Sequence, residues 1–377
     1  MGKRSFDILG DLMKILLVEP EYYSRFPPLG LLKLSAYHKS KGDAVHLVRG
    51  CVQAPFYPDR IYVTSLFTWA WRPVWRVVRY YKEIYPEAEV WLGGLYASLM
   101  PEHAAKSGVD VVFRGVIEDV EDLMPDYEIL ETSERWKKWD GSIIFTSRGC
   151  NNRCPYCAVW RIEGPLNSAK RSIKHLVYPK HNRIIILDNN FLQNPYWRDI
   201  CDELEELGKY VDFNQGLDAR LITSRVANRL SKLKLDSGGG IKVRLGYDSS
   251  SLRSYVEKAI KHLNSAGING RRIMVYVLFN YNDDPEDFFN RVRDVLNWGA
   301  VAYPMRYEPL DALEKNSYIS PKWTREEIEM VQKARRVIGY GGAFPPYEGI
   351  LKKFNSAHDF HEAFSLRPPK RKKSKGE

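Results

Sequence analysis

The sequence predicts an α/β protein: an N-terminal, doubly wound parallel sheet of Rossmann type, then a partial (β/α)6 barrel of TIM type, then a small helical piece. Two observations carry this prediction. Short apolar runs alternate with longer stretches at helical spacing along most of the 377-residue chain. Polar residues also follow directly on many apolar runs, as in parallel sheets whose ligands lie beyond the carboxyl ends of the strands. A chain of this length suits two domains.

The first domain is expected at residues 1–125. Its predicted strands span 13–18, 44–48, 61–66, 89–92 and 109–113, and its longer helices span 29–40 and 72–85. The fourth strand ends on Gly93-Gly94, at the edge where ligands of such sheets bind. Three tryptophans follow the third strand. We expect Trp75 to lie in the core, whereas Trp69 and Trp71 fall where a loop could stack on the ring of a ligand.

Residues 126–141 are polar and predict a linker, and residues 142–310 predict the barrel-type core. The six expected strands of this core span 142–147, 183–187, 211–214, 241–245, 272–279 and 300–305. Helices should begin near Tyr196, Thr223, Leu252 and Pro285. Residues 311–366 predict a helical extension, in which a capping box at Thr324 starts a helix.

The formal net charge of +10 is unevenly distributed. Residues 367–377 hold six basic side chains and one acid, lack apolar periodicity and predict a disordered tail. That tail is either a solubilising end or a contact for an acidic partner or nucleic acid. No run approaches the ~20 apolar residues of a membrane span. The N-terminus lacks signal-peptide features, and five cysteines are too few for a disulfide scaffold, so we expect a cytoplasmic protein.

Three of the five cysteines lie together. Cys150, Cys154 and Cys157 follow the pattern C-x3-C-x2-C, with the aromatic Tyr156 before the last. A structural zinc site would need a fourth ligand, and the nearest candidates are His175 and His181. Thiolates at this spacing suit an iron–sulfur cluster better, because they can ligate separate irons of one cube.

The cysteine motif resembles that of the radical S-adenosylmethionine (SAM) superfamily. The resemblance implies that a [4Fe-4S] cluster is held by Cys150, Cys154 and Cys157. These three cysteines are therefore the expected catalytic and metal-binding residues. In that family SAM binds the open iron, and one electron breaks its C–S bond to make a 5′-deoxyadenosyl radical. The resemblance also implies a low-potential electron donor such as flavodoxin or ferredoxin.

The first domain resembles the cobalamin-binding domain that precedes many radical SAM cores. The resemblance lies in the run from Pro27 to Leu32, in Gly93-Gly94 and in the turn from Arg114 to Glu118. It implies that Gly93 and Gly94 line a cofactor cleft. The family's cobalt-ligating motif Asp-x-His-x-x-Gly is absent from this sequence, so the domain is either a cobalamin site without that histidine or a scaffold.

Polar residues at the predicted strand ends are candidates for holding SAM, whose ammonium, carboxylate, diol and adenine need carboxylate, guanidinium and amide partners. The cofactor-binding candidates are Tyr156, Asp188, Asn189, Gln215, Arg220, Asp248, Ser249 and Asn280. The run from Gly246 to Ser251 is similar to a SAM-contacting segment of the family. About half of such residues are expected to be only helix N-caps, as Asp284 before Pro285 should be.

The prediction is therefore a radical SAM enzyme, with cobalamin-dependent methyl transfer as one form. A cobalamin-independent rearrangement or oxidation is the alternative, and a metal-dependent nucleic-acid-binding module is a third reading. Only Cys51 and Cys201 remain outside the motif, too few for a second cluster. The substrate could be a small molecule, a peptide or a nucleic acid.

Overall fold

The computed structural model describes residues 12–339 and 346–365. It divides into two compact units. The first unit comprises Met1–Asn189 and Glu308–Ser317, and the second comprises Asn190–Tyr307 and Tyr318–Glu377. The division by packing thus falls inside the predicted core rather than at the predicted linker. Both units are mixed α/β with parallel strands, as the sequence predicts.

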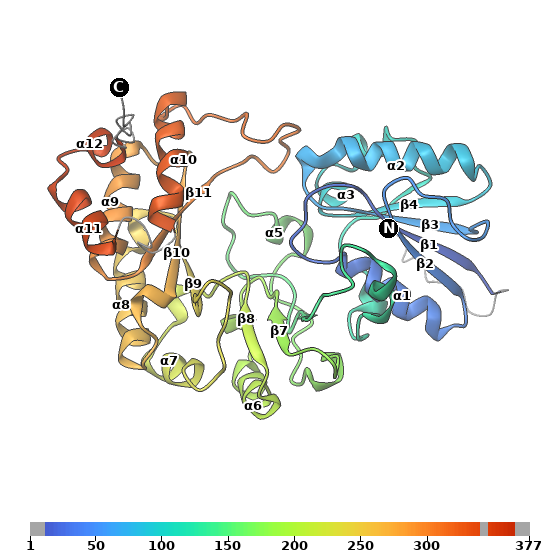
Figure 1. The fold of residues 1–377 in the computed structure, drawn as a ribbon, viewed down its shortest axis with the longest axis horizontal. Helices are drawn as coiled ribbons and strands as arrows, with labels where there is room; N and C mark the ends of the chain where they lie inside the picture. Colours follow the sequence, from blue (N-terminus) through green and yellow to red (C-terminus); the bar gives the residue numbers. More distant parts are fainter. Residues whose placement is uncertain (1–11, 340–345, 366–377) are drawn as a thin grey trace, which may run out of the picture. The chain divides into compact units, whose positions relative to one another are not determined.

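The first unit contains a five-stranded sheet in which every pairing is parallel (Figure 1). Its strands are β1 (Lys14–Glu19), β2 (Ala44–Arg49), β3 (Arg60–Ser65), β4 (Glu89–Gly94) and β5 (Val111–Val112). Their order is β2-β1-β3-β4-β5, so the chain's progress across the sheet reverses between β1 and β3. The predicted fifth strand, 109–113, pairs over only two residues.

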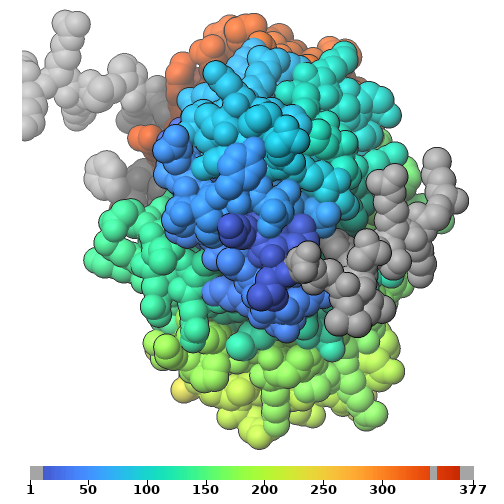
Figure 2. Space-filling model, turned by 90° about the vertical axis from the view of Figure 1, so that its right-hand side faces the viewer, coloured from blue at the N-terminus to red at the C-terminus, as the bar shows by residue number. Residues whose placement is uncertain are grey.

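The sheet of the first unit separates two apolar clusters because its side chains alternate between faces. Leu16 and Val18 lie in one cluster, and Ile15 and Leu17 lie in the other. The first cluster is completed by α2 (Trp71–Ile84), α3 (Leu95–Leu99) and α4 (Pro101–Ala105), and the second by α1 (Leu29–Ser40). On the face shown in Figure 2, residues of this unit (blue to cyan) pack into one continuous surface.

The segment 126–141, expected from its polarity to be a linker, packs into the second of these clusters. Tyr127, Ile129, Leu130 and Trp136 are all buried there. Trp136 Nε1 also donates to Glu19 Oε2 (2.8 Å) at the end of β1. Four apolar side chains among many charges carry no helical or strand period, and therefore their burial could not be predicted.

The predicted core begins in the first unit and continues in the second. In the first unit β6 (Ser142–Ile144) and β7 (Arg183–Ile186) pair in parallel, with α5 (Val159–Ile162) between them in sequence. The second unit contains β8 (Tyr210–Phe213) and a parallel sheet of β9 (Val243–Tyr247), β10 (Ile273–Phe279) and β11 (Val301–Arg306). Its helices up to β11 are α6 (Trp197–Leu207), α7 (Ser224–Leu230), α8 (Arg253–Ser265) and α9 (Pro285–Asn297).

The predicted helical extension is present as α10 (Arg325–Gly339), α11 (Tyr347–Ser356) and α12 (Phe360–Phe364). The capping box holds: Glu327 N–H donates to Thr324 Oγ1 (3.2 Å), and Thr324 N–H donates to Glu327 Oε2 (2.7 Å). The predicted tail, 367–377, lies outside the described residues. No helix of the part that the structure describes is long and apolar enough to cross a membrane.

Candidate functional site

The cysteine loop is closed by backbone pairing on either side of it. Arg148 and Asn167 form an antiparallel bridge, and Cys150 N–H donates to Gly164 O (3.1 Å). Gly149, between them, has φ +70°, and a Cβ at this position would lie 2.1 Å from Pro165 O. Only glycine fits so close an approach at this φ. The residue before the first cysteine is therefore required by the loop itself, whatever the loop binds.

None of the three cysteines of the motif forms a disulfide. Cys150 is buried, and Cys154 and Cys157 are half-buried. Asn152 N–H donates to Cys150 Sγ (3.4 Å), and Val159 N–H donates to Cys157 Sγ (3.5 Å). Such donors stabilise thiolates and tune iron–sulfur clusters through their sulfurs. The donor set of this loop therefore fits a thiolate-ligated cluster.

A single-ion site is a different arrangement, and it is not seen. Within residues 12–339 and 346–365, no three His, Cys, Asp or Glu side chains converge where one metal ion could bind. His175 Nε2 instead contacts Asp122 Oδ1 (3.0 Å), and His181 Nδ1 contacts Ser142 Oγ (3.1 Å). Cluster thiolates bind separate irons, so their sulfurs need not converge on one point.

Within the first unit, an ion-pair network connects the cysteine loop to Glu121 and to Lys33 of α1. Arg148 donates to Glu121 through Nε (2.6 Å) and Nη2 (2.8 Å), and Lys33 Nζ lies 3.1 Å from Glu121 Oε1. Burial lowers the pKa of Lys33 to about 8, against the raising effect of Glu121. Burial raises the pKa of Glu121, but hydrogen bonds and charges from Arg148 and Lys33 outweigh it, so the net shift is downward. This carboxylate is therefore ionised and holds Arg148 in place.

Glu163 was missed by the sequence reasoning, and it links the cysteine loop to the end of β7. Its Oε2 accepts from Gly149 N–H and from Asn189 Nδ2, each at 2.9 Å, and its Oε1 lies 3.4 Å from Arg148 Nη1. The structure thus brings the candidate Asn189 next to the loop, with its amide group oriented by a carboxylate. No motif distinguishes an acid six residues after the last cysteine, because the contacts form only in the fold.

The Asp188 side chain accepts hydrogen bonds within the protein and is not exposed to solvent. It is buried, Thr146 N–H (2.5 Å) and Ser147 Oγ (2.9 Å) donate to its carboxylate, and Thr146 Oγ1 donates as well. These bonds divert the backbone after Ile144, which explains why the predicted strand 142–147 ends three residues early. Burial raises the pKa of Asp188 to about 6, and its hydrogen bonds oppose the shift.

The candidates at the ends of β8 and β9 differ in what they contact. Gln215 is exposed after β8, and Arg220 is paired with Asp218 through Nε (2.8 Å) and Nη2 (2.6 Å). Ser249 accepts from Ser251 N–H (3.3 Å) and caps a short 3-10 turn. Asp248 is half-buried and folds back over Gly246, where a Cβ would lie 3.2 Å from Asp248 Oδ2. Gln215 thus places an amide at the end of β8, and Asp248 places a carboxylate at the end of β9.

Asn280 has a structural role that the sequence did not reveal. It is fully buried at the end of β10 with φ +65°, which asparagine tolerates better than most residues. Its Nδ2 donates to Tyr318 O (3.1 Å), and its Oδ1 accepts from Ser320 N–H (2.8 Å). Both ends of the amide thus hold residues 318–320 against β10.

Arg291 of α9 was also missed, and it fixes the ends of two strands. Its guanidinium is buried and donates to Tyr247 O (2.9 Å) and Leu278 O (2.8 Å) from Nη1. Nη2 donates to Asp283 Oδ2 (2.6 Å), and Nε donates to Asp287 Oδ2 (2.8 Å). Because Tyr247 precedes Asp248 and Leu278 lies two residues before Asn280, Arg291 positions the exits of both β9 and β10. An arginine at helical spacing gives no sign that it is buried.

The Gly93-Gly94 pair ends β4 as predicted. Gly94 has φ +101° and ψ −172°, and a Cβ there would lie 2.0 Å from Ser65 O on β3. Gly93 has ordinary space, with Phe113 Cβ 3.9 Å from its Cβ position. The packing of β3 against β4 therefore requires Gly94 independently of any ligand.

The three tryptophans after β3 make different contacts. Trp75 Nε1 donates to Tyr96 OH (3.0 Å), and the Trp71 and Trp75 rings are 4.7 Å apart. Trp71 Nε1 donates to Leu313 O (3.3 Å). Trp69 stacks on the exposed Phe67 ring with centroids 4.5 Å apart. Trp71 and Trp75 thus make structural contacts, but all three tryptophans are half-buried, so Trp75 does not lie in the core as predicted.

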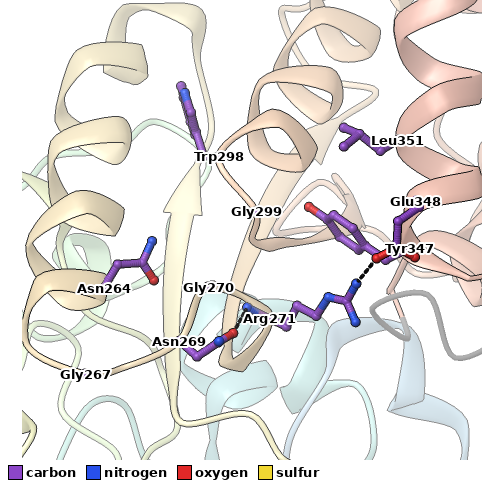
Figure 3. A pocket seen from close by; sticks show the side chains of 10 residues that line it. All are labelled: Asn264, Gly267, Asn269, Gly270, Arg271, Trp298, Gly299, Tyr347, Glu348 and Leu351. Atoms are coloured by element: carbon purple, nitrogen blue, oxygen red, sulfur yellow. Dashed lines mark hydrogen bonds and ion pairs between the residues drawn. The ribbon is translucent and has the colours of Figure 1, made fainter.

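A hollow of about 820 Å³ in the second unit is unrelated to these residues. Figure 3 shows Arg271 and Glu348 facing each other across it, with Nη2 2.7 Å from Oε1. Gly267, Gly270 and Gly299 line its wall. The hollow lies before the first residue of β10, at the amino end of the parallel strands, whereas ligands of parallel α/β folds bind at the carboxyl end.

The chain matches no protein-family model, and its comparison with curated proteins found no match. The functional argument therefore rests on the residues themselves. Of the candidates, Cys150, Cys154, Cys157 and Asn189 share one neighbourhood in the first unit, where Glu163 connects the loop to Asn189.

Proposed function

We propose that the protein is a radical SAM enzyme, which cleaves S-adenosylmethionine reductively at a [4Fe-4S] cluster. The observation that carries the proposal is the cysteine loop: three cysteines within eight residues, none in a disulfide, two of whose sulfurs accept backbone N–H groups. Cys150, Cys154 and Cys157 would hold the cluster. When bound, the cluster would supply the electron that breaks the C–S bond of SAM.

The chain's other residues have supporting roles in this proposal. Glu163 orients Asn189 beside the loop, so that its amide oxygen would accept from the ammonium group of SAM. Arg148, held by Glu121, keeps a positive charge next to the cysteines. Three other candidates form hydrogen bonds with nearby backbone, namely Asp188, Ser249 and Asn280. Arg220 forms an ion pair with Asp218.

The direct test is the formation of 5′-deoxyadenosine. The full chain would be reconstituted anaerobically with iron and sulfide, reduced with dithionite and given SAM, with the nucleoside measured by chromatography. We expect turnover in the wild type, and in Cys201→Ser because Cys201 is buried on α6. Cys150→Ser, Cys154→Ser and Cys157→Ser should each lose both the cluster absorbance and the product. A wild-type protein that holds the cluster but leaves SAM intact would reject the proposal.

Cobalamin-dependent methyl transfer is the more specific form of this function. It is favoured by the first unit, a parallel sheet whose strand order reverses between β1 and β3, because ligands of such sheets bind beyond the carboxyl ends at that position. Gly93 and Gly94 end the neighbouring strand β4. In this form the first unit would hold cobalamin without a histidine ligand; in the alternative form it is a scaffold for a rearrangement or oxidation.

Hydroxocobalamin titration of the reconstituted protein separates the two forms. A stoichiometric complex, seen in the visible spectrum, would favour methyl transfer. No complex in a sample with an intact cluster would favour the cobalamin-independent reaction. Either form needs a low-potential electron donor of the flavodoxin or ferredoxin kind and a reducing compartment, because free thiols and the cluster do not survive oxidation.

A further inference from the structure

The β9–β11 sheet of the second unit has two unlike faces. One face packs on α9: Tyr247 OH donates to Asp294 Oδ2 (3.2 Å), and the Phe279 and Phe288 rings lie 5.1 Å apart. Because side chains alternate along a strand, Gly246, Tyr276 and Tyr303 belong to the other face. The buried pattern of β10 agrees, since every second side chain of that strand is only half-buried.

Three residues of this second face form one row across the sheet. Gly246 pairs with Tyr276, and Tyr276 pairs with Tyr303, in the parallel register. The Tyr276 and Tyr303 rings are 5.6 Å apart, edge to face. Gly246, with no side chain, leaves the space next to Tyr276 to the folded-back carboxylate of Asp248. The row thus runs from a carboxylate, over two half-buried rings, toward α10.

Arg335 of α10 completes the row at its other end. Its guanidinium carbon lies 4.5 Å above the Tyr303 ring, and its Nη2 donates to Tyr303 OH. Gly339 permits this packing, because a Cβ there would lie 2.8 Å from the Tyr303 ring. Among residues 12–339 and 346–365, no carboxylate lies within ion-pair distance of Arg335. A half-buried guanidinium oriented by a tyrosine and lacking a counter-charge is suited to an anion from outside the chain.

We propose that Arg335, with Tyr303 and Tyr276, binds the substrate, and that the substrate is a small molecule carrying a planar ring and a carboxylate or phosphate. The ring would lie over the two tyrosines, and the anionic group would receive the free N–H groups of Arg335. Gly246 and Tyr303 are two strand spacings apart, about 10 Å, so Asp248 and Arg335 lie toward opposite ends of the row, with Tyr276 between them. That the bound molecule is the enzyme's substrate rests on the proposed function, whereas the binding site itself does not.

The test is direct binding of chosen probes, with no turnover. Phenyl phosphate and benzoate carry a ring and an anion, inorganic phosphate carries the anion alone, and benzyl alcohol carries the ring alone. Binding to the full reconstituted chain would be measured by saturation-transfer NMR at millimolar probe. We expect both aromatic anions to bind more tightly than either partial probe, and the stronger of the two to identify phosphate or carboxylate as the natural group.

Substitutions then locate the site. Arg335→Gln should weaken binding of the preferred aromatic anion about tenfold or more, since hydrogen bonds to charged groups contribute about 1.5–3 kcal/mol. Tyr303→Phe keeps the ring but frees the guanidinium, so a smaller loss is expected. Arg336→Gln, the exposed neighbour on α10, is the matched control and should bind as the wild type does. Equal binding by the wild type and Arg335→Gln, or none by the wild type, would overturn the inference, while absent SAM cleavage with intact binding would fault only the proposed function.

Discussion

Replacing Arg291 by methionine should destabilise the second unit strongly while leaving its helix intact. Methionine has a similar length and suits a buried helical position, so little volume is lost. What is lost is the buried cation and its bonds to Tyr247 O, Leu278 O, Asp283 and Asp287. Asp283 would then be left buried without its Arg291 partner; burial already raises its pKa, and Arg291 is the main opposing charge.

The size of the effect follows from the burial of the pair. The side chains of Arg291 and Asp283 are 1% and 7% exposed, so solvent cannot replace the lost partner. Removing one member of such a buried pair costs about 3–5 kcal/mol. If β9 and β10 open locally, their amide hydrogens should exchange roughly 10²–10⁴ times faster in the variant. Hydrogen exchange followed by mass spectrometry of peptides covering these strands would measure this change.

Two further variants make the measurement decisive. Arg293→Met on the same helix removes a half-exposed arginine over the Phe289 ring, and it should change exchange by less than about tenfold. Adding Asp283→Asn to Arg291→Met removes the stranded charge and should recover part of the loss. The reasoning is refuted if Arg291→Met and Arg293→Met change the exchange rates equally, or if the double variant exchanges as fast as Arg291→Met. Arg291 would then not stabilise the ends of β9 and β10 as its contacts indicate.

Two other outcomes follow from the first unit. Gly94→Ala should lower the free energy of unfolding by about 1–3 kcal/mol from backbone strain alone, with more from the contact with Ser65 O, whereas Gly93→Ala should change it by less than about 1 kcal/mol in chemical denaturation. Asp188 has a pKa raised from 3.8 to about 6, so its contribution to stability is complete below the unfolded pKa and is lost as the pH rises through about 6. The stability of the wild type relative to Asp188→Asn, measured by chemical denaturation, should therefore fall by about 3 kcal/mol from acid to neutral pH, and a constant difference would contradict this assignment.

Most elements of the fold could be predicted because their signals are local. The helix at Leu29–Ser40 follows from apolar spacing and the preceding prolines, and α9 follows from Asp284 and Pro285 at its start. Strand lengths were less predictable. β6 is shorter than its apolar run because Asp188, 42 residues away in sequence, captures the backbone N–H of Thr146.

The sequence singles out the three cysteines of the candidate site, whereas the residues that support their loop could not be predicted. Glu163 and Arg291 each have ordinary sequence surroundings, and their roles exist only where loops or strand ends meet them. Conversely, Asn280 and Ser249 have the right residue type at a strand end, but their side chains are engaged by backbone of the same unit. Residue type reports what a side chain can bond to, and the fold decides which partner is nearest.

By itself the sequence determined the α/β class, the alternation of strands and helices, and a loop of three thiols at cluster spacing, because these depend on composition and on separations of a few residues. The tertiary structure alone decided that residues 126–141 contribute to a core, that Arg148 is held by Glu121, and that Arg335 stands over the Tyr303 ring. Each of these depends on contacts between residues tens of positions apart. Burial and pairing at that range are set by how the elements pack, which no local pattern records.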